Sequence, residues 1–189
     1  MSDFLKSLET AVAVFEGLKE QEDNLVRAAE WCVEALLADH KLLLCGNGGS
    51  ASEAQHLAGE LIGRYKETRR PLAAVALGAD AAVLTCVSND FCYEEVFSRQ
   101  VRGLGQPGDV LIVFTTSGNS PNILAALRAA REMSIRSIAF LGCNGGQARS
   151  LADCSLLVKH MDTARAQEGH QFLMHCLMDQ IEAGIRAAA

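Results

Sequence analysis

The sequence predicts an α/β protein: a three-layer α/β/α sandwich with a central five-stranded parallel sheet, preceded by two helices. From Lys41 onward, short apolar runs alternate with segments of helical length, the pattern of crossover units that cover both faces of a parallel sheet. A chain of 189 residues, 49% hydrophobic and 21% charged, can bury one core. We expect a single domain over residues 1–189, with an N-terminal helical extension at about 1–39.

Two amphipathic helices are predicted in this extension. In the first, apolar residues recur at steps of three and four, the spacing of one helix face; they are Leu5, Leu8, Val12, Phe15 and Leu18. The second covers about 25–37, and its apolar side chains are Val26, Ala29, Val33, Leu36 and Leu37.

The alternating region makes up the rest of the chain. Apolar runs predict strands over 41–45, 73–77, 110–115, 136–141 and 154–158. The segments between and after them predict helices over 50–64, 80–88, 93–104, 121–133, 146–152 and 166–186. The sequence contains no internal repeat, low-complexity tract or long linker that would divide it into two domains.

Composition excludes several classes of function. The formal net charge is −6, without a block of like charge, whereas general nucleic-acid binding needs a basic face. No apolar stretch approaches the roughly 20 residues of a membrane span, and the first residues do not resemble a signal peptide. The seven cysteines are scattered and form no C-x-x-C pair, which favours a reduced compartment, so we expect a cytoplasmic protein.

The most informative segment joins a strand, a glycine-rich loop and a helix. The apolar run Leu42–Cys45 is followed by Gly46-Asn47-Gly48-Gly49-Ser50, a loop whose backbone N–H groups can converge on an anion. The helix that follows carries His56 and Glu60, which share one face because they are four residues apart. An imidazole and a carboxylate beside an anion site indicate an enzyme for a phosphorylated small molecule.

A second loop has similar chemistry. Thr115-Thr116-Ser117-Gly118-Asn119-Ser120-Pro121 follows an apolar strand, with Ser120 suited to be the N-cap and Pro121 the first residue of the next helix. Hydroxyls and N–H groups at a helix N-terminus form a natural phosphate site. Both loops follow strands, and ligands of open parallel sheets bind beyond the carboxyl ends of the strands.

Other interpretations of these loops are weaker. Residues 46–51 fit G-x-G-x-x-A, the dinucleotide fingerprint, but the next strand does not end in the acidic residue that the fingerprint requires. No lysine follows as in a nucleotide P-loop, and His56-x-x-x-Glu60 is not the zinc-protease motif. The second loop, taken alone, is also compatible with simple turn and cap chemistry.

The last predicted helix carries a further polar group. Gln167, His170 and His175 form a polar face on a helix that is otherwise apolar. A single helical histidine is more often structural than functional, but two of them with a glutamine suggest a site. His40 and His160 have no comparable setting, and we expect both at the surface.

Together these features resemble the phosphosugar-binding isomerases of the SIS-domain family, and within it the phosphoheptose (sedoheptulose 7-phosphate) isomerases. The resemblance covers essentially the whole chain, because separate motifs occur in the expected order. After the two helices come CGNGGS at 45–50, QHLAGEL at 55–61, VSND at 87–90, FSRQV at 97–101, TTSGNSPN at 115–122 and QEGH…H in the last helix.

The resemblance implies a SIS fold and an aldose–ketose isomerase that interconverts sedoheptulose 7-phosphate and D-glycero-D-manno-heptose 7-phosphate through an enediolate. This reaction would be the first step of ADP- or GDP-heptose synthesis for lipopolysaccharide core or other surface glycans. Such chemistry needs a base, a group that moves hydroxyl protons and a stabiliser of the oxyanion. A carboxylate, an imidazole and a metal ion can supply these.

Individual residues receive roles from the same resemblance. Glu60 and His175 would be the catalytic acid/base pair. One zinc ion per subunit would be bound by His56, Glu60, Gln167 and His175, whose nitrogen and oxygen donors suit zinc. The substrate-binding residues would be Asn47, Gly48, Gly49, Ser50, Glu60, Asn89, Asp90, Thr115, Thr116, Ser117, Ser120 and Gln167, of which the four hydroxyl residues from Thr115 to Ser120 would hold the phosphate.

One spacing conflicts with a metal site built from a single chain. Gln167 and His175 are eight residues apart, which is about 12 Å along a straight helix. Either the segment near Gln167 is not a regular helix, or the two residues come from different chains that meet at one site. The second option requires a homo-oligomer, and the resemblance implies a homotetramer with sites at its subunit interfaces.

A non-enzymatic function is the alternative. The family includes a tetrameric protein that binds the bacterial replication initiator. That protein resembles the isomerases in its loops but lacks a carboxylate at the position of Glu60 and a histidine at that of His175. This chain has both residues. A sugar-sensing regulator would need an additional DNA-binding domain, for which 189 residues leave no room.

Overall fold

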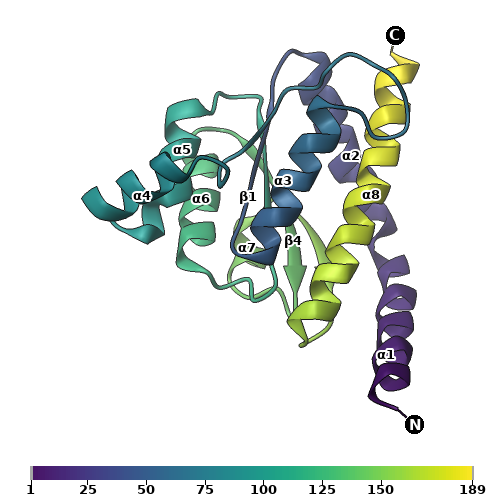
Figure 1. Ribbon diagram of the computed structural model, residues 1–189. Helices are drawn as coiled ribbons and strands as arrows, with labels where there is room; N and C mark the ends of the chain where they lie inside the picture. The colour runs from purple at the N-terminus through teal and green to yellow at the C-terminus, as the bar shows by residue number, and fades with distance from the viewer. Residues whose placement is uncertain (1, 189) are drawn as a thin grey trace.

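A computed structural model describes residues 2–188. Its five strands form one parallel sheet in the order β2-β1-β3-β4-β5, as the alternating pattern predicts (Figure 1). The strands are β1 (Leu42–Gly46), β2 (Ala74–Ala76), β3 (Val110–Thr115), β4 (Arg136–Gly142) and β5 (Cys154–Val158).

Every predicted helix is present, with small shifts of its ends. The helices are α1 (Asp3–Gly17), η1 (Leu18–Gln21), α2 (Glu22–Leu37), α3 (Gly49–Ile62), α4 (Ala81–Asp90), η2 (Tyr93–Glu95), α5 (Val96–Leu104), α6 (Pro121–Glu132), α7 (Ala148–Leu151) and α8 (Thr163–Ala187). The prediction began the last helix three residues too late, because the Asp162 carboxylate caps the backbone N–H of Ala164 and starts the helix there.

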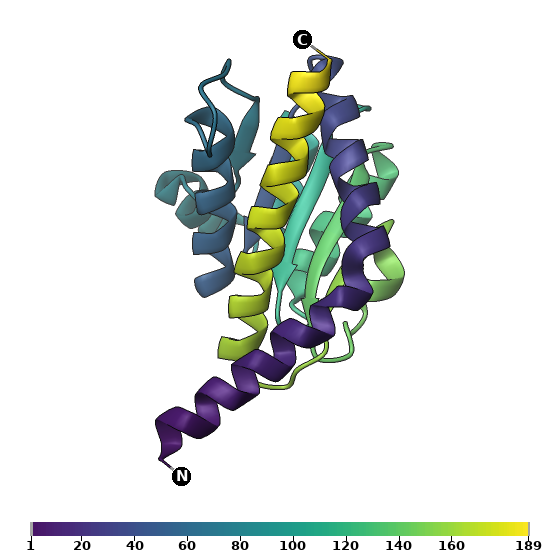
Figure 2. The ribbon, with the colours of Figure 1, turned by 90° about the vertical axis from the view of Figure 1, so that its right-hand side faces the viewer.

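Helices cover both faces of the sheet and complete three layers. On one face α2, α3 and α8 pack against side chains such as Leu44, Ile112 and Phe140. On the other, α5 and α6 pack against the alternate strand residues, including Cys45, Leu111 and Val113. This division follows from the strand period of two. Figure 2 shows α8 and α2 side by side over the first face.

The first helix extends away from the three layers (Figures 1 and 2). None of its residues is buried, and its apolar face is exposed at Phe4, Leu5, Leu8, Val12 and Phe15. Two contacts join it to α8: Phe15 packs on Phe172 with ring centroids 5.2 Å apart, and Arg165 donates to the carbonyl and hydroxyl of Ser7. An amphipathic helix with its apolar face in solvent indicates an interaction surface.

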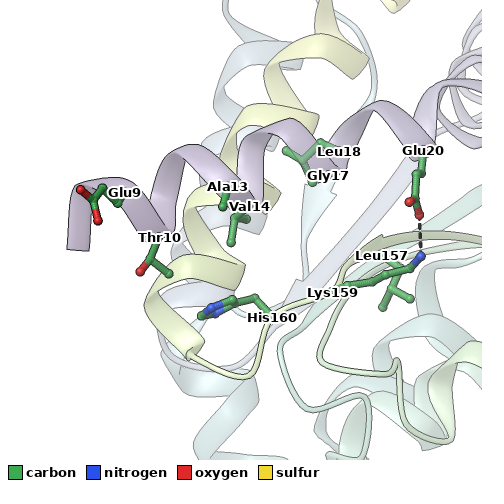
Figure 3. A pocket seen from close by; sticks show the side chains of 10 residues that line it. All are labelled: Glu9, Thr10, Ala13, Val14, Gly17, Leu18, Glu20, Leu157, Lys159 and His160. Carbon is green, nitrogen blue, oxygen red and sulfur yellow. Dashed lines mark hydrogen bonds and ion pairs between the residues drawn. The ribbon is translucent and has the colours of Figure 1, made fainter. Parts of the chain in front are cut away.

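A groove of about 500 Å³ lies beneath α1. Figure 3 shows that α1 forms one wall and that Leu157, Lys159 and His160 lie across from it, with Lys159 bound to Glu20. None of the predicted site residues lines this groove, so it is separate from the site described below. None of the helices within residues 2–188 combines the length and apolarity needed to span a membrane.

Three histidines differ from expectation. His170 is fully buried, so it does not share the polar face of Gln167 and His175. His40 and His160 are half-buried rather than at the surface. His40 lies 3.7 Å from the buried carboxylate of Asp109, and His160 lines the groove beneath α1.

Candidate functional site

The topology brings the two predicted loops together. β1 and β3 are neighbours although β2 lies between them in sequence, and their register pairs Gly46 with Phe114. The loops that leave their carboxyl ends therefore start next to each other, at the point where the strand order reverses. Ligands of doubly wound sheets bind at such a switch point.

A reciprocal pair of amides joins the loops. Asn47 Nδ2 donates to Asn122 Oδ1 over 2.9 Å, and Asn122 Nδ2 donates to Asn47 Oδ1 over 2.8 Å. The Tyr93 hydroxyl donates to the same Asn47 oxygen over 3.1 Å. The Asn47 side chain therefore holds the two loops together. Neither Asn122 nor Tyr93 was among the site residues predicted from the sequence.

The first loop turns sharply into α3. Gly48 has a φ of +58°, a conformation that glycine adopts without strain, and α3 begins at Gly49. A Cβ atom on Gly49 would lie 2.4 Å from the side-chain nitrogen of Gln167. Gln167 therefore rests on this loop, and only glycine leaves room for it. Gly48 and Gly49 are exposed, whereas Ser50 is buried.

The second loop presents fewer hydroxyls than its sequence suggests. Thr115 is buried, and its hydroxyl accepts a hydrogen bond from Gly118 N–H, so it supports the loop from below. Thr116, Ser117 and Ser120 lie nearer the surface. Ser120 is the N-cap residue of α6, as predicted, but its side chain makes no cap hydrogen bond. These three residues and the N-terminus of α6 are the accessible part of the predicted anion site.

A hydrogen-bonded group of four side chains joins α3 to α8. His56 Nε2 lies 3.0 Å from Glu60 Oε1. Gln171 Nε2 lies 3.0 Å from His56 Nδ1 and 3.1 Å from His175 Nε2. The predicted acid/base residues Glu60 and His175 therefore belong to one network. Gln171 was not singled out from the sequence, although its spacing of four from both Gln167 and His175 places it on their helix face.

A loop after α3 completes the surroundings of His175. The ring of Tyr65 stacks on His175 with centroids 5.6 Å apart and an interplanar angle of 14°. The buried carboxylate of Glu182 accepts from the backbone N–H groups of Tyr65, Lys66 and Glu67 and from Arg69 Nε.

Arg69 itself donates to the backbone carbonyls of Glu60 and Leu61. The Arg69–Glu182 pair thus ties the end of α3 and the Tyr65 loop to α8. Roles for Tyr65, Arg69 and Glu182 were not predicted, because Glu182 is far from the other two in sequence and the three residues form no motif.

The predicted metal ligands are not all together in one chain. α8 is continuous from Thr163 to Ala187, so the option of an irregular segment near Gln167 is wrong. Gln167 lies on Gly49, while His175 belongs to the network with His56. No three His, Cys, Asp or Glu side chains within residues 2–188 are placed to hold a metal ion. A complete site needs side-chain movement or a ligand from a second chain.

Two of the predicted zinc ligands, His56 and Glu60, are nevertheless placed as in a zinc site. His56 Nε2 and Glu60 Oε1 are 3.0 Å apart, close to the spacing of about 3.3 Å between two nitrogen or oxygen ligands in a tetrahedral zinc site. Both side chains reach solvent. Nitrogen and oxygen donors of this kind are ordinary zinc ligands.

Asn89 and Asp90 lie at the exposed end of α4. Asn89 Nδ2 donates to Asp90 Oδ1 over 2.8 Å, and the Cys86 thiol donates to Asp90 Oδ2 over 3.5 Å. The Tyr93–Asn47 hydrogen bond connects this segment to the first loop.

A buried ionisable pair lies between α3 and α8. His170 Nδ1 is 3.8 Å from Glu53 Oε2, and the imidazole packs edge-on against Phe114 and Phe140. Neither ring nitrogen of His170 has a hydrogen-bond partner among the described residues. The prediction that His170 shares a polar face with Gln167 and His175 is therefore wrong, and Glu53 was not among the predicted residues.

The chain is similar to known proteins over most of its length. The family model of the SIS domain matches residues 7–142. The phosphoheptose isomerase of Paramagnetospirillum magneticum is 50% identical over 175 residues, covering 93% of this chain and 90% of that protein.

Two solved structures are similar over nearly the whole chain. The phosphoheptose isomerase of Neisseria gonorrhoeae has a TM-score of 0.90 and 40% identity, covering 95% of this chain and 97% of that one. The phosphoheptose isomerase of Francisella tularensis has a TM-score of 0.92 and 34% identity, covering 97% and 100%.

Proposed function

The chain belongs to the SIS-domain family, and on this premise we propose that it is a phosphoheptose isomerase that interconverts sedoheptulose 7-phosphate and D-glycero-D-manno-heptose 7-phosphate. One observation carries the proposal: Glu60 and His175 belong to a single hydrogen-bonded network on the two helices beside the switch-point loops. The initiator-binding protein of the family lacks a carboxylate and an imidazole at these positions, and no contact within residues 2–188 favours that function.

The phosphate binds at the second loop in this proposal. Thr116, Ser117 and Ser120 supply hydroxyls, and the N-terminus of α6 supplies N–H groups and a favourable dipole. Thr115, which was expected to hold the phosphate directly, shapes the loop through its bond to Gly118 N–H. The protein's net negative charge gives no general attraction for an anion, so these local groups provide the affinity.

The sugar end lies toward α3 and α8. Glu60 takes and returns the proton that moves between C1 and C2, and His175 moves the proton of the neighbouring hydroxyl. The backbone of Asn47, Gly48 and Gly49, with Ser50 beneath it, shapes the cradle. Asn89, Asp90 and Gln167 hold the remaining hydroxyl groups.

We propose one zinc ion per subunit, with His56, Glu60, Gln167 and His175 as its ligands. The His56–Glu60 spacing supports two of these ligands, and a bound zinc ion acts as a Lewis acid toward developing negative charge on oxygen. Because Gln167 and His175 lie at different levels of one regular helix, the proposal requires rearrangement on binding or ligands from two subunits.

Assembly into a homotetramer, with sites at the subunit interfaces, accompanies this proposal. The exposed apolar face of α1 continues over Phe172 of α8, next to a hollow that Leu25, Leu173 and Cys176 also line. A surface of this composition is typical of one that a second copy covers.

The cellular setting is proposed from the same reasoning. All seven cysteines are free thiols, which favours a cytoplasmic location. The product would enter ADP- or GDP-heptose synthesis for lipopolysaccharide core or other surface glycans.

A direct assay tests the function. Purified protein with zinc supplied should equilibrate the two heptose 7-phosphates without a redox cofactor. Glu60→Gln keeps the shape and hydrogen-bonding capacity of the side chain but removes its basicity, and loss of general-base action reduces turnover by about 10²–10⁴-fold. The control is Glu132→Gln, at the opposite end of α6 from the phosphate loop, which should leave turnover unchanged.

Metal content must be measured beside turnover, because Glu60 is also a proposed zinc ligand. The decisive measurement is solvent deuterium entering C1 or C2 of the sugar with metal-loaded Glu60→Gln. Exchange at the parent rate would show that Glu60 is not the base. Absence of any conversion by the zinc-supplied parent protein would reject the isomerase itself.

A further inference from the structure

We propose that Gln171 is a positioning residue that fixes the ring orientations of His56 and His175. Its side-chain nitrogen lies 3.0 Å from His56 Nδ1 and 3.1 Å from His175 Nε2, and it is the link between the two imidazoles, whose centroids are 5.3 Å apart. Only the effect of Gln171 on catalysis rests on the proposed function. The orientation itself can be measured without substrate.

The two helices hold Gln171 where it can make both contacts. It lies on the regular helix α8, one turn before His175, and reaches across to α3. The other side of His175 is covered by the ring of Tyr65. His175 is thus held by stacking on one side and by an amide on the other, while His56 is held by Glu60 and the same amide.

The hydrogen atoms can be assigned from the network. A carboxylate only accepts hydrogen bonds, so His56 must carry its proton on Nε2, which faces Glu60 Oε1. His56 Nδ1 is then an acceptor, and the Gln171 side-chain NH₂ donates to it. The second hydrogen of the same NH₂ group points to His175 Nε2, so neutral His175 carries its proton on Nδ1.

The Gln171 side-chain amide can also rotate by about 180°, which exchanges the positions of its nitrogen and oxygen and suits the opposite placement of the ring protons. If a cation takes the place of the proton on His56 Nε2, the ring proton moves to Nδ1, and the Gln171 oxygen accepts from it. Neutral His175 then carries its proton on Nε2 and donates to the same oxygen. In both arrangements Nε2 of His56 faces Glu60. A hydrogen-bond partner on the distal nitrogen of a metal-binding histidine typically raises affinity by about 10–100-fold.

Gln171→Met tests the proposal, because methionine keeps the length and helix propensity of glutamine but has no donor of this kind. The matched control is Gln180→Met on the same helix, whose glutamine has no side-chain hydrogen bond among the described contacts. Circular dichroism and melting temperature should match the parent for both variants, which establishes that they are folded.

Two readouts are independent of activity. ¹⁵N imidazole spectra of metal-free protein at fixed pH should show His175 with its proton on Nδ1 in the parent, and a mixture of the two neutral tautomers in Gln171→Met. Zinc affinity should fall by about 10–100-fold in Gln171→Met and stay unchanged in Gln180→Met. In turnover, kcat should fall while KM changes little, because the phosphate site is untouched.

An unchanged His175 tautomer together with unchanged zinc affinity in Gln171→Met would overturn the proposal. A parent protein that shows the predicted tautomers and binds zinc but does not convert heptose 7-phosphates would reject the proposed function and leave the role of Gln171 standing. The two failures are therefore distinguishable.

Discussion

The side-chain amides of Asn47 and Asn122 exchange two hydrogen bonds across the switch point of the sheet, at 2.9 and 2.8 Å. Asn122 is buried and also accepts from the backbone N–H of Ile123. The pair joins the loop after β1 to the first turn of α6. It therefore sets the separation between the proposed sugar cradle and the proposed phosphate site.

Asn122→Ala should weaken both stability and substrate binding. It removes both amide–amide hydrogen bonds, and each hydrogen bond typically contributes about 0.5–1.5 kcal/mol. We expect a lower free energy of unfolding in urea and a raised KM for the sugar phosphate. Asn144→Ala, at an exposed turn, is the control. A variant with parent KM would show that the pair does not set the loop separation.

Gly49→Ala should displace Gln167. The new Cβ would lie 2.4 Å from Gln167 Nε2, so that side chain must leave the loop. We expect turnover to fall at least tenfold, with little loss of stability because glutamine is flexible. Gly59→Ala on the same helix meets nothing within 4 Å and should stabilise the protein by up to about 1 kcal/mol. Steady-state kinetics and thermal melts distinguish the two, and equal activity would contradict the proposed role of Gln167.

Glu182→Gln should be strongly destabilising. The Glu182 and Arg69 side chains are only 5% and 9% exposed, and breaking a buried ion pair typically costs about 3–5 kcal/mol. The Tyr65 loop should also lose order, which hydrogen exchange at residues 65–67 would report. Asp179→Asn removes the exposed Lys66–Asp179 pair one turn earlier and should cost only about 0–1 kcal/mol. Similar unfolding free energies for both variants would show that the Arg69–Glu182 pair does not hold the Tyr65 loop to α8.

The apolar face of α1 should be required for assembly. Leu8→Glu combined with Val12→Glu places two charges on an exposed face that contributes nothing to the described core. Light scattering should show a tetramer for the parent and smaller species for the variant, with the fold unchanged by circular dichroism. Lys6→Glu is the control for added negative charge on α1. A monomeric parent at micromolar concentration would reject both the tetramer and a site shared between subunits.

The reactivity of the Cys86 thiol should depend on the Asp90 carboxylate. The thiol is exposed, and its hydrogen bond to Asp90, reinforced by the negative charge of that carboxylate, raises the pKa of Cys86. A raised pKa means less thiolate at a given pH and slower reaction with iodoacetamide. Asp90→Asn should therefore speed alkylation of Cys86 near pH 8, as followed by mass spectrometry of its peptide. Burial raises the pKa of Cys32 and Cys45, so both should stay unmodified in the same samples.

Local pattern was sufficient for the secondary structure. The apolar run Val110–Phe114 and the Ser120-Pro121 start of α6 lie where the sequence places them, because strand burial and helix capping depend on residues close in the chain. The pairing of His56 with Glu60 follows equally from a spacing of four on one helix. His170 and His175 show where local pattern is insufficient. Their polarity predicted a shared helix face, but His170 is buried against Phe114 and Phe140.

The sequence by itself determined the layers of the fold, the two loops at the carboxyl ends of strands and the types of side chain that the site contains. The tertiary structure decided which of them meet: Asn47 with Asn122, Gln171 with His56 and His175, and Glu182 with the loop after α3. Apart from Gln171 and His175, which are four positions apart on α8, these contacts join residues 75 to 117 positions apart. They exist because β1 lies beside β3 and α8 returns across α3. Hydrophobic periodicity specifies which face of an element is buried, but strand order and helix packing determine what that face touches.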